Sequence, residues 1–327
     1  MMRAIVQDGY GPPEALRVGS VPVPAPRDDE VLVRVRAAGV DPGVWHVVTG
    51  LPYGVRLGFG LRRPRQPVPG LDLAGVVTAV GSRVRDLAVG DAVFGTGRGS
   101  FAEHAVAKAD QVAPMPATLS FQEAAAVPIS GQTALAAARK AGDLEGRRVM
   151  VLGAGGGVGA FAVQLAKAEG AHVTGVCSAG KADFVRSLGA DEVVDYTVTD
   201  PTAPTSAAPA YDVVIDTAGN RRLTRLRRAL TPRGVLLLIG GEAGEGRLLQ
   251  GFDRQARALL WSPLLHQRLV PVMGKQRTTD LQTLAGLIDT GRIRPVIDRV
   301  FPLEDAAAAV AHVGSGHARA KTVLSLD

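Results

Sequence analysis

The sequence predicts an α/β protein with two parts, one of which is a doubly wound parallel sheet. The chain has 327 residues, which is more than one ordinary hydrophobic core supports. From Arg147 onward, short runs of β-branched residues alternate with helical segments, as in a parallel sheet covered on both faces. Between the first such run and the next helix stand the glycines of "LGAGGGVG", residues 152–159.

The composition fits a globular protein and excludes several classes. Apolar residues make up 46% of the chain and charged residues 21%. No apolar run reaches the length of a membrane span, and the charges at Arg3 and Asp8 predict no secretory signal, so we expect no membrane partner. The single cysteine excludes an internal disulfide and fits a reducing compartment, so we predict a cytoplasmic protein.

The excess of basic over acidic residues does not predict a nucleic-acid partner. The 37 lysines and arginines exceed the 31 acidic residues, which gives a net charge of +6 and a pI near 9.8. The charges are dispersed, aromatic residues are only 4%, and no nucleic-acid-binding motif accompanies them. The densest run, Arg221–Arg228, carries leucines at helical spacing. We interpret this run as the solvated face of an amphipathic helix.

Short strands separated by turns are predicted for the first 123 residues, which are rich in valine and alanine and punctuated by glycine and proline. The segments are 4–7, 30–40, 74–81, 91–96 and 101–108. An alanine-rich helix follows over residues 120–142, where Ser120 and Glu123 form a capping-box pattern at the start.

Six parallel strands are predicted from Arg147 onward. Their segments are 147–153, 171–177, 192–196, 211–219, 234–241 and 268–274, with helices predicted over 157–169, 181–189 and 221–228. Gly170 and Gly189 follow the first two helices, at positions where a left-handed residue ends a helix. Six strands that alternate with helices fit a doubly wound dinucleotide-binding fold.

Two further segments complete the predicted organisation. Residues 200–210 stand where a crossover helix is expected, but Pro201 and Pro204 predict a loop there. After about residue 275, the chain predicts a helix, a strand, a helix and a last strand, which we interpret as a return into the first domain. The predicted domains are therefore 1–123 with 275–327, which hold the substrate, and 124–274, which binds the cofactor.

The glycine-rich turn predicts a site for a dinucleotide pyrophosphate. Ala154, Gly156 and Gly159 occupy the first, third and sixth positions of an A-x-G-x-x-G pattern, directly after a strand and at the start of a helix. The first position allows the tight turn, the second lets the backbone approach the pyrophosphate, and Gly159 lets helix and strand pack closely. The helix N-terminus then offers free N–H groups and a positive dipole to the phosphates.

The end of the second strand predicts NADPH as the cofactor. A carboxylate there would hold the ribose 2′-hydroxyl of NADH, but the strand ends in Cys177 and Ser178. Ser178 can donate a hydrogen bond to a 2′-phosphate, and Lys181 can supply positive charge. Tyr196, at the end of the third strand, is expected beside them.

With these residues and further motifs, the chain resembles the medium-chain dehydrogenase/reductase superfamily in its zinc-free, quinone oxidoreductase-like branch. The landmarks run nearly end to end and are "AAGVDPGVW", "PVPGLDLAGVVTAVGSRV", "VGDAVFG", "GSFAEHAV", "AAAVPISGQTAL", "GAGGGVGAFAVQLAKAEGA", "SLGADEVVDY", "DTAGN" and "GHARAKTVLSL". The resemblance implies a GroES-like, mostly β substrate domain with a Rossmann domain inserted in it. It also implies a homodimer.

The resemblance further implies positions for the cofactor-binding residues. They are Thr133 near the nicotinamide; Gly155, Gly156, Gly157 and Val158 along the pyrophosphate; Ser178, Lys181 and Tyr196 at the 2′-phosphate; Gly240 and Gly241 beside the nicotinamide ribose; and His317, Ala318 and Arg319 over the cofactor. The chain departs from the branch at Asp41, where relatives often carry asparagine, and at Ala320, where a glycine is common before the lysine.

The implied reaction is hydride transfer from NADPH to a quinone or an α,β-unsaturated carbonyl compound. This chemistry needs a stacked substrate, a donor at the acceptor oxygen and exclusion of water. Tyr53 is the candidate donor, with packing in a turn as the alternative. Asp41, Trp45 and His46 are candidate residues of the substrate cleft, with core packing as the alternative for the last two.

No metal site is expected, because the thiolate ligand that zinc-dependent relatives use in the first domain is replaced by Asp41, and Leu71–Asp72 stands where a His-Glu pair would be. Asp41, His46 and Asp72 could form only an oxygen-rich set that differs from those of zinc alcohol dehydrogenases. Two alternatives stay open: an alcohol or aldehyde dehydrogenase, and a non-catalytic NADPH-binding protein.

Overall fold

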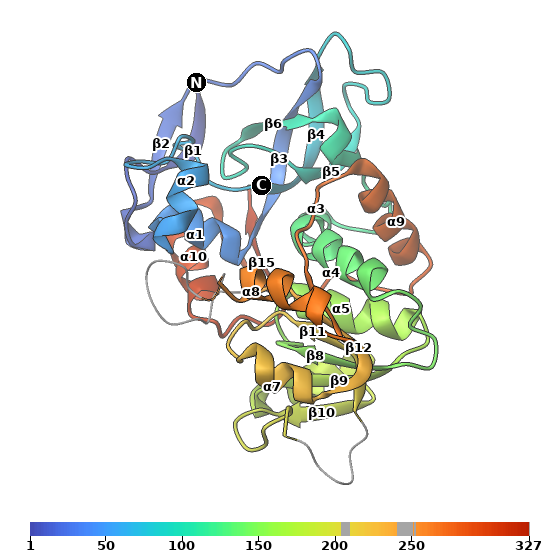
Figure 1. The fold of residues 1–327 in the computed structure, drawn as a ribbon. Helices are drawn as coiled ribbons and strands as arrows, with labels where there is room; N and C mark the ends of the chain where they lie inside the picture. Colours follow the sequence, from blue (N-terminus) through green and yellow to red (C-terminus); the bar gives the residue numbers. More distant parts are fainter. Residues whose placement is uncertain (204–209, 241–250, 252, 327) are drawn as a thin grey trace. The chain divides into compact units, whose positions relative to one another are not determined.

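Two units make up the structure, a computed structural model that describes residues 1–203, 210–240, 251 and 253–326 (Figure 1). The first unit combines Met1–Gln132 with Lys275–Asp327, and the second is Thr133–Gly274. Helix α4 (Pro128–Ala141) begins in the first unit and ends in the second. Each unit is built on a sheet of its own.

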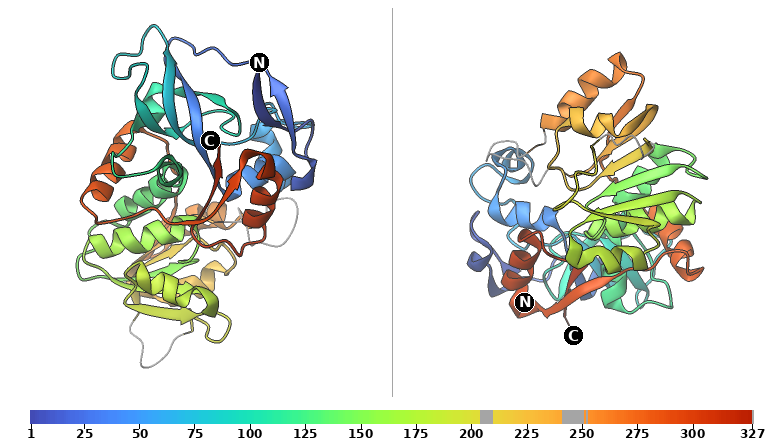
Figure 2. Two further views of the ribbon diagram at one scale, coloured as in Figure 1. Left: turned by 180° about the vertical axis from the view of Figure 1, so that it is seen from behind. Right: turned by 90° about the horizontal axis from the view of Figure 1, so that it is seen from below.

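The second unit contains a parallel sheet of six strands in the order β10-β9-β8-β11-β12-β13. The strands are β8 (Arg148–Leu152), β9 (His172–Cys177), β10 (Glu192–Asp195), β11 (Tyr211–Asp216), β12 (Leu230–Leu238) and β13 (Arg268–Pro271). The order turns back between β8 and β11, as in a doubly wound dinucleotide-binding fold, so this prediction is confirmed. Figure 2 shows the strands from behind and from below, where they fan out with the twist of a parallel sheet.

Helices α5 (Gly157–Ala168), α6 (Ala182–Ser187), α7 (Leu223–Arg228) and α8 (Asp253–Trp261) lie between these strands along the chain. After α5, Gly170 adopts a left-handed φ of 81°, as the predicted helix end requires. In α7, Leu223 and Leu226 are buried while Arg225 is exposed, so the amphipathic interpretation is confirmed. In the predicted 200–210 loop, Pro201 lies in a turn, whereas residues 204–209 fall outside the described residues.

The first unit contains a seven-stranded sheet and a separate two-stranded sheet of β1 (Met2–Val6) and β2 (Arg17–Val21). The larger sheet has the order β14-β15-β3-β4-β5-β7, with β6 also paired to β3. Its strands are β3 (Glu30–Val40), β4 (Asp72–Val80), β5 (Ala92–Thr96), β6 (His104–Lys108), β7 (Val112–Pro114), β14 (Ile297–Pro302) and β15 (Lys321–Ser325). The last strand of the chain, β15, pairs antiparallel with β3, so the two chain ends share one sheet (Figure 1).

Helices α1 (Pro42–Thr49), α2 (Arg56–Phe59), α3 (Phe121–Ala125), α9 (Thr278–Asp289) and α10 (Ala306–Gly314) complete the first unit. The single helix predicted over residues 120–142 is wrong in one respect, because the structure divides it into α3 and α4. Pro128 explains the break, since proline has no backbone N–H and disfavours helical geometry in the residue before it. The predicted capping box of Ser120 and Glu123 at the start of α3 is confirmed.

Ala320, the residue before β15, has a φ of 49°. It is the single non-glycine residue with a positive φ among those that the structure describes. The left-handed region costs an ordinary residue about 1–2 kcal/mol, because its Cβ crowds the following carbonyl. Because alanine stands here in place of the glycine that is common in relatives, the backbone is strained directly before Lys321.

We predict that Ala320→Gly does not lower the free energy of unfolding. Relief of the left-handed strain offsets the extra chain entropy that glycine loses on folding, which is about 0.5–1 kcal/mol. Ala309→Gly is the matched control, because Ala309 is a buried alanine in ordinary helical geometry within α10. It should cost about 1 kcal/mol. Equal losses in the two variants, measured by urea unfolding, would contradict this account.

Candidate functional site

The turn between β8 and α5 is open at Gly156 and closely packed at Gly159. Gly156 is the N-cap of α5, and a Cβ built on it would meet only the Gly153 carbonyl oxygen, at 3.4 Å. A Cβ on Gly159 would lie 2.1 Å from that same oxygen, so helix and strand pack here without room for a side chain. The left-handed residue of the turn is Gly153, with φ 78°, and not Ala154, to which the sequence pattern assigned the tight turn.

The predicted 2′-phosphate residues gather at the ends of β9 and β10. A Cβ on Gly155 would lie 2.8 Å from Cδ of Lys181, so the lysine side chain lies against the glycine turn. The backbone N–H of Tyr196 donates to the Cys177 carbonyl, which places Tyr196 beside the strand end that carries Ser178. The structure thus brings Ser178, Lys181 and Tyr196 to one edge of the sheet.

Asp195 is a carboxylate at this edge that the sequence reasoning missed. It ends β10 and pairs in register with Cys177 of β9. Its oxygen Oδ1 accepts hydrogen bonds from the backbone N–H of Thr197 at 2.9 Å and from the Thr197 hydroxyl at 2.7 Å. These bonds lower the pKa of Asp195. Only the register between β9 and β10, which is a tertiary feature, places Asp195 beside the end of β9.

The remaining predicted positions of the second unit lie near the carboxyl ends of the sheet strands. The N–H of Gly240 donates to the Asp216 carbonyl, and Gly241 lies outside the described residues. Thr133 lies beside Gly274, where a Cβ would be 2.9 Å from the threonine hydroxyl. Asp216, at the end of β11, is fully buried and forms an ion pair with Arg254 of α8, which no motif in the sequence indicated.

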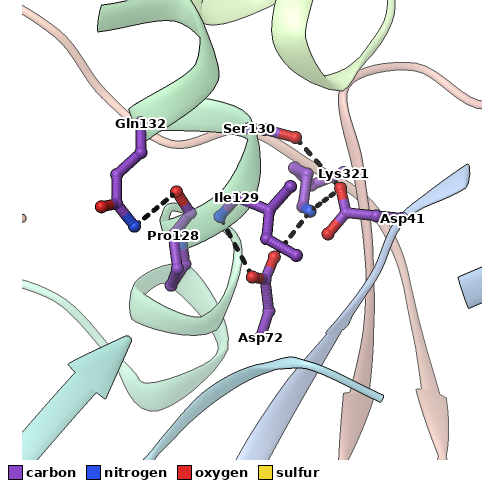
Figure 3. A network of polar contacts seen from close by, with 7 residues as sticks. All are labelled: Asp41, Asp72, Pro128, Ile129, Ser130, Gln132 and Lys321. Atoms are coloured by element: carbon purple, nitrogen blue, oxygen red, sulfur yellow. Dashed lines mark hydrogen bonds and ion pairs between the residues drawn. The ribbon is translucent and has the colours of Figure 1, made fainter. Parts of the chain in front are cut away.

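In the first unit, a buried network of charges joins Asp41, Asp72 and Lys321 (Figure 3). The Lys321 ammonium donates to Oδ1 of Asp41 and, at 3.1 Å, to Oδ2 of Asp72. All three side chains are at most 6% exposed. Figure 3 shows the ammonium lying between the two carboxylates. The structure therefore places the Lys321 ammonium between the two acids that the sequence singled out.

Helix α4 supplies the remaining partners of the network. The Ser130 hydroxyl donates to Asp41 at 3.1 Å, and the backbone N–H of Ile129 donates to Asp72 at 3.0 Å. A Cβ on Gly39 would lie 2.8 Å from Cβ of Asp72, so the glycine allows β3 and β4 to approach here. Sequence reasoning identified Asp41 and Asp72 but missed Lys321 and Ser130, because neither belongs to a local motif with a recognised ligand.

The pKa values of the three groups in the network shift in different ways. Burial by itself raises the pKa of Asp41, but the Lys321 ammonium and hydrogen bonds overcome that effect and hold it below its usual value. Burial raises the pKa of Asp72 well above its usual value, and the charge on Asp41 adds to the rise. Burial lowers the pKa of Lys321, but the two carboxylates more than reverse this. The network therefore favours the charged forms of Asp41 and Lys321 and shifts Asp72 toward its neutral form.

The other predicted residues of the first unit have distinct environments. Trp45 packs against the hydrophobic core, and a Cβ on Gly314 of α10 would lie 2.5 Å from its ring. His46 is buried, and its Nδ1 is 2.6 Å from the Leu51 carbonyl oxygen. Tyr53 is 42% exposed, with the Arg56 guanidinium 4.7 Å from its ring centroid.

His317 and Arg319 are exposed in the segment before β15, and Ala318 is half-buried there. Their predicted contact with the cofactor, like the cleft positions of Asp41, Trp45 and His46, stays a prediction.

Comparison with known proteins decides the family. The family described as "Alcohol dehydrogenase GroES-like domain" matches residues 27–117, and that described as "Zinc-binding dehydrogenase" matches residues 188–324. The mouse (Mus musculus) NAD(P)H oxidoreductase RTN4IP1, mitochondrial, is 33% identical, over 100% of this chain and 89% of the relative. The chain belongs to the medium-chain dehydrogenase/reductase superfamily, in its quinone oxidoreductase-like branch. This membership confirms the GroES-like and Rossmann components of the predicted fold.

Two further comparisons agree with this assignment to the medium-chain dehydrogenase/reductase superfamily. The chloroplast envelope quinone oxidoreductase homolog of Arabidopsis thaliana is 32% identical, over 99% of this chain and 98% of the relative. The solved structure of the quinone oxidoreductase from Coxiella burnetii has a TM-score of 0.87 at 27% identity, over 100% of this chain and 99% of that one. Membership of this superfamily makes the chain an oxidoreductase with a nicotinamide dinucleotide as cofactor.

We predict that Gly156→Ala weakens cofactor binding at least tenfold, or about 1.4 kcal/mol, without loss of stability. The added methyl group meets no protein atom closer than 3.4 Å, but it stands where a pyrophosphate must approach the backbone. Titration calorimetry with NADPH measures the affinity. Gly159→Ala is the matched control and should instead destabilise the fold, since its methyl group would lie 2.1 Å from a carbonyl oxygen. Unchanged NADPH affinity in Gly156→Ala would show that the turn has no role in binding.

We predict that Asp41→Asn destabilises the protein more than Asp72→Asn. The first change leaves the buried Lys321 ammonium without its ionised partner, and breaking a buried ion pair in this way costs about 3–5 kcal/mol. Asparagine at position 72 is neutral, and the raised pKa of Asp72 means that the fold disfavours a charge there more than at Asp41, so the cost of this change should be smaller. Denaturant unfolding at neutral pH measures both variants. Equal costs would contradict the unequal division of charge.

The same network predicts a pH dependence. A raised pKa means that folded Asp72 keeps a proton that the unfolded chain releases above about pH 4, so this group destabilises the fold as pH rises through that window. The free energy of unfolding should therefore rise more steeply, or fall less, with pH in Asp72→Asn than in the unaltered protein. Parallel pH profiles would show that Asp72 has an ordinary pKa.

Proposed function

We propose that the protein is an NADPH-dependent reductase of quinones or α,β-unsaturated carbonyl compounds that works without a metal. The observation that carries this proposal is the Lys321 ammonium, which lies between Asp41 and Asp72 and neutralises carboxylates that could otherwise bind a cation. Within the described residues, no group of three His, Cys, Asp or Glu side chains is placed to hold a metal ion. Quinones and enones accept hydride without a Lewis acid, whereas unactivated carbonyls benefit from one.

The second unit would hold NADPH through its backbone and two side chains. The N-terminal amides of α5, preceded by Gly155 and Gly156, would bind the pyrophosphate. Ser178 and Lys181 would bind the 2′-phosphate by a hydrogen bond and by charge. Thr197 engages Oδ1 of the Asp195 carboxylate at the same edge, and we propose that the charge of Lys181 outweighs this acid in the choice of cofactor. When bound, the cofactor supplies a hydride.

The chain's own contribution to the reaction would be binding, orientation and a proton donor. We propose Tyr53 as that donor, because its side chain is exposed and carries a hydroxyl that can donate a proton. We propose that Asp41, Trp45 and His46 lie behind the residues that would contact the substrate in the cleft, since Asp41 and His46 are buried. His317, Ala318 and Arg319 are proposed to contact the cofactor.

An alcohol or aldehyde dehydrogenase is the second candidate, because the descriptions of both matching families name dehydrogenases and one of them names zinc. The buried ion network opposes it, since Lys321 already occupies the space between the two carboxylates. A non-catalytic NADPH-binding protein is the third candidate, and activity measurements separate it from the other two.

We further propose a homodimer. The edge strand β13 of the second unit has one unpaired side in the described sheet. Exposed apolar side chains occur in the segments that precede and follow it, namely Leu259, Leu260, Leu264 and Met273, and a second copy could cover them.

Among the described helices, none is both long and apolar enough to cross a membrane. The mouse relative is named as mitochondrial, and a cytoplasmic location for this chain stays a prediction.

We predict that NADPH binds at least tenfold more tightly than NADH, since loss of the phosphate contacts should cost about 1.4 kcal/mol or more. Lys181→Ala and Ser178→Asp should reduce this ratio by weakening NADPH binding. Arg233→Ala is the matched control, because it removes one exposed positive charge elsewhere in the second unit. Equal affinities for the two cofactors in titration calorimetry would overturn the assignment.

The proposed activity is tested by NADPH consumption with a panel of quinones, enones, enoyl thioesters and simple aldehydes. We expect turnover of quinones or enones, little turnover of simple aldehydes, and the same rates after treatment with a chelator. Metal analysis of the purified protein should show no stoichiometric zinc. Activity that a chelator abolishes and zinc restores would favour the dehydrogenase. No turnover of any compound by protein that binds NADPH would favour the non-catalytic protein.

A further inference from the structure

A cavity of about 270 Å³ in the first unit has no part in the proposed reaction. It lies among the start of β3, the end of β5, β6 and the first turn of α4. Leu71, Val106 and Ile129 contribute apolar surface to its wall. Water in such a space has few partners along these side chains, so an occupant with an apolar body would gain by displacing it.

Three cations line the same cavity against a single carboxylate. The cations are Arg27, Arg98 and Lys108, and the carboxylate is Glu30. Both Glu30 oxygens are engaged, one by the Arg98 guanidinium at 2.6 Å and the other by the backbone N–H of Arg27 at 3.1 Å. Within the part of the chain that the structure describes, the side chains of Arg27 and Lys108 form no ion pair. The cavity therefore presents a net positive charge with two cations available to an anion.

A buried threonine also lines the cavity. Thr96 lines the cavity and is only 5% exposed. Its Oγ1 has no hydrogen-bond partner among the described residues. This oxygen is itself shielded, so it is not among the groups that would contact a ligand. Thr96 also pairs in register with Asp72, so the cavity wall is continuous with the buried ion network.

We propose that this cavity is a binding site for a small organic carboxylate with an apolar body. The carboxylate is bound by Arg27 and Lys108, and the apolar body lies against Leu71, Val106 and Ile129. Inorganic phosphate would satisfy the cations but leave the apolar wall in contact with water, so it should bind more weakly. This proposal goes beyond the proposed reductase activity and does not depend on it.

Benzoate is a suitable probe, because it joins a carboxylate to a compact apolar ring. Its binding can be followed by methyl NMR of the protein labelled at threonine and isoleucine, with the methyl groups of Thr96 and Ile129 as reporters. We expect saturable shifts of both signals with a Kd of about 1 mM or below. The shifts should persist when NADPH is present at saturation. Benzamide, which lacks the charge, and inorganic phosphate, which lacks the apolar body, should each bind at least tenfold more weakly.

Variants separate the proposed site from general attraction of anions to a basic protein. The double variant Arg27→Gln with Lys108→Gln should weaken benzoate binding at least tenfold. Arg299→Gln is the matched control, as an exposed arginine on β14, and should leave the affinity unchanged.

Several results would overturn the proposal. They are the absence of saturable shifts up to about 10 mM benzoate, equal binding of benzamide or phosphate, and unchanged affinity in the double variant. Displacement of benzoate by NADPH would place the probe in the cofactor site and would likewise overturn it, while leaving the proposed reductase activity untouched.

Discussion

The buried ion network of Asp41, Lys321 and Asp72 is the constraint on which the first unit depends. Removing these charges from water is expensive, and the structure recovers that cost only because each group has a partner at hydrogen-bonding distance. The partners come from the end of β3, the start of β4 and the start of β15. Loss of Lys321 or Asp41 leaves a buried charge without its main partner, so the pairing of three strands brings together the groups that stabilise one ammonium.

Two local features of the backbone follow from this network. Ala320 accepts a left-handed φ of 49° directly before Lys321, although glycine would adopt it without strain. Gly39 has no side chain where the Asp72 side chain approaches β3. The first turn of α4 completes the network through Ser130 and the N–H of Ile129, so the start of this helix is held by charge as well as by packing.

Sequence patterns were informative wherever the physical cause is local. The six strands of the second unit were predictable because buried parallel strands are continuously apolar and the helices between them end at glycines. The glycine turn was predictable because close helix–strand packing excludes a side chain at Gly159. Local reasoning failed at Ala154, since the left-handed residue is its neighbour Gly153. It failed again across Pro128, which divides one predicted helix into two.

The sequence alone determined the fold class, the glycine turn, the acid-free end of β9 and the lack of a thiolate at position 41. These depend on residue type and spacing along a short segment, which composition and periodicity report directly. Only the tertiary structure decided what neutralises Asp41 and Asp72, because Lys321 is separated from them by 280 and 249 residues. It also decided that Asp195 lies beside Cys177 and that Leu71, Val106 and Ile129 line one cavity. Strand register sets these contacts, and register is fixed by the packing of the whole sheet and not by any one segment.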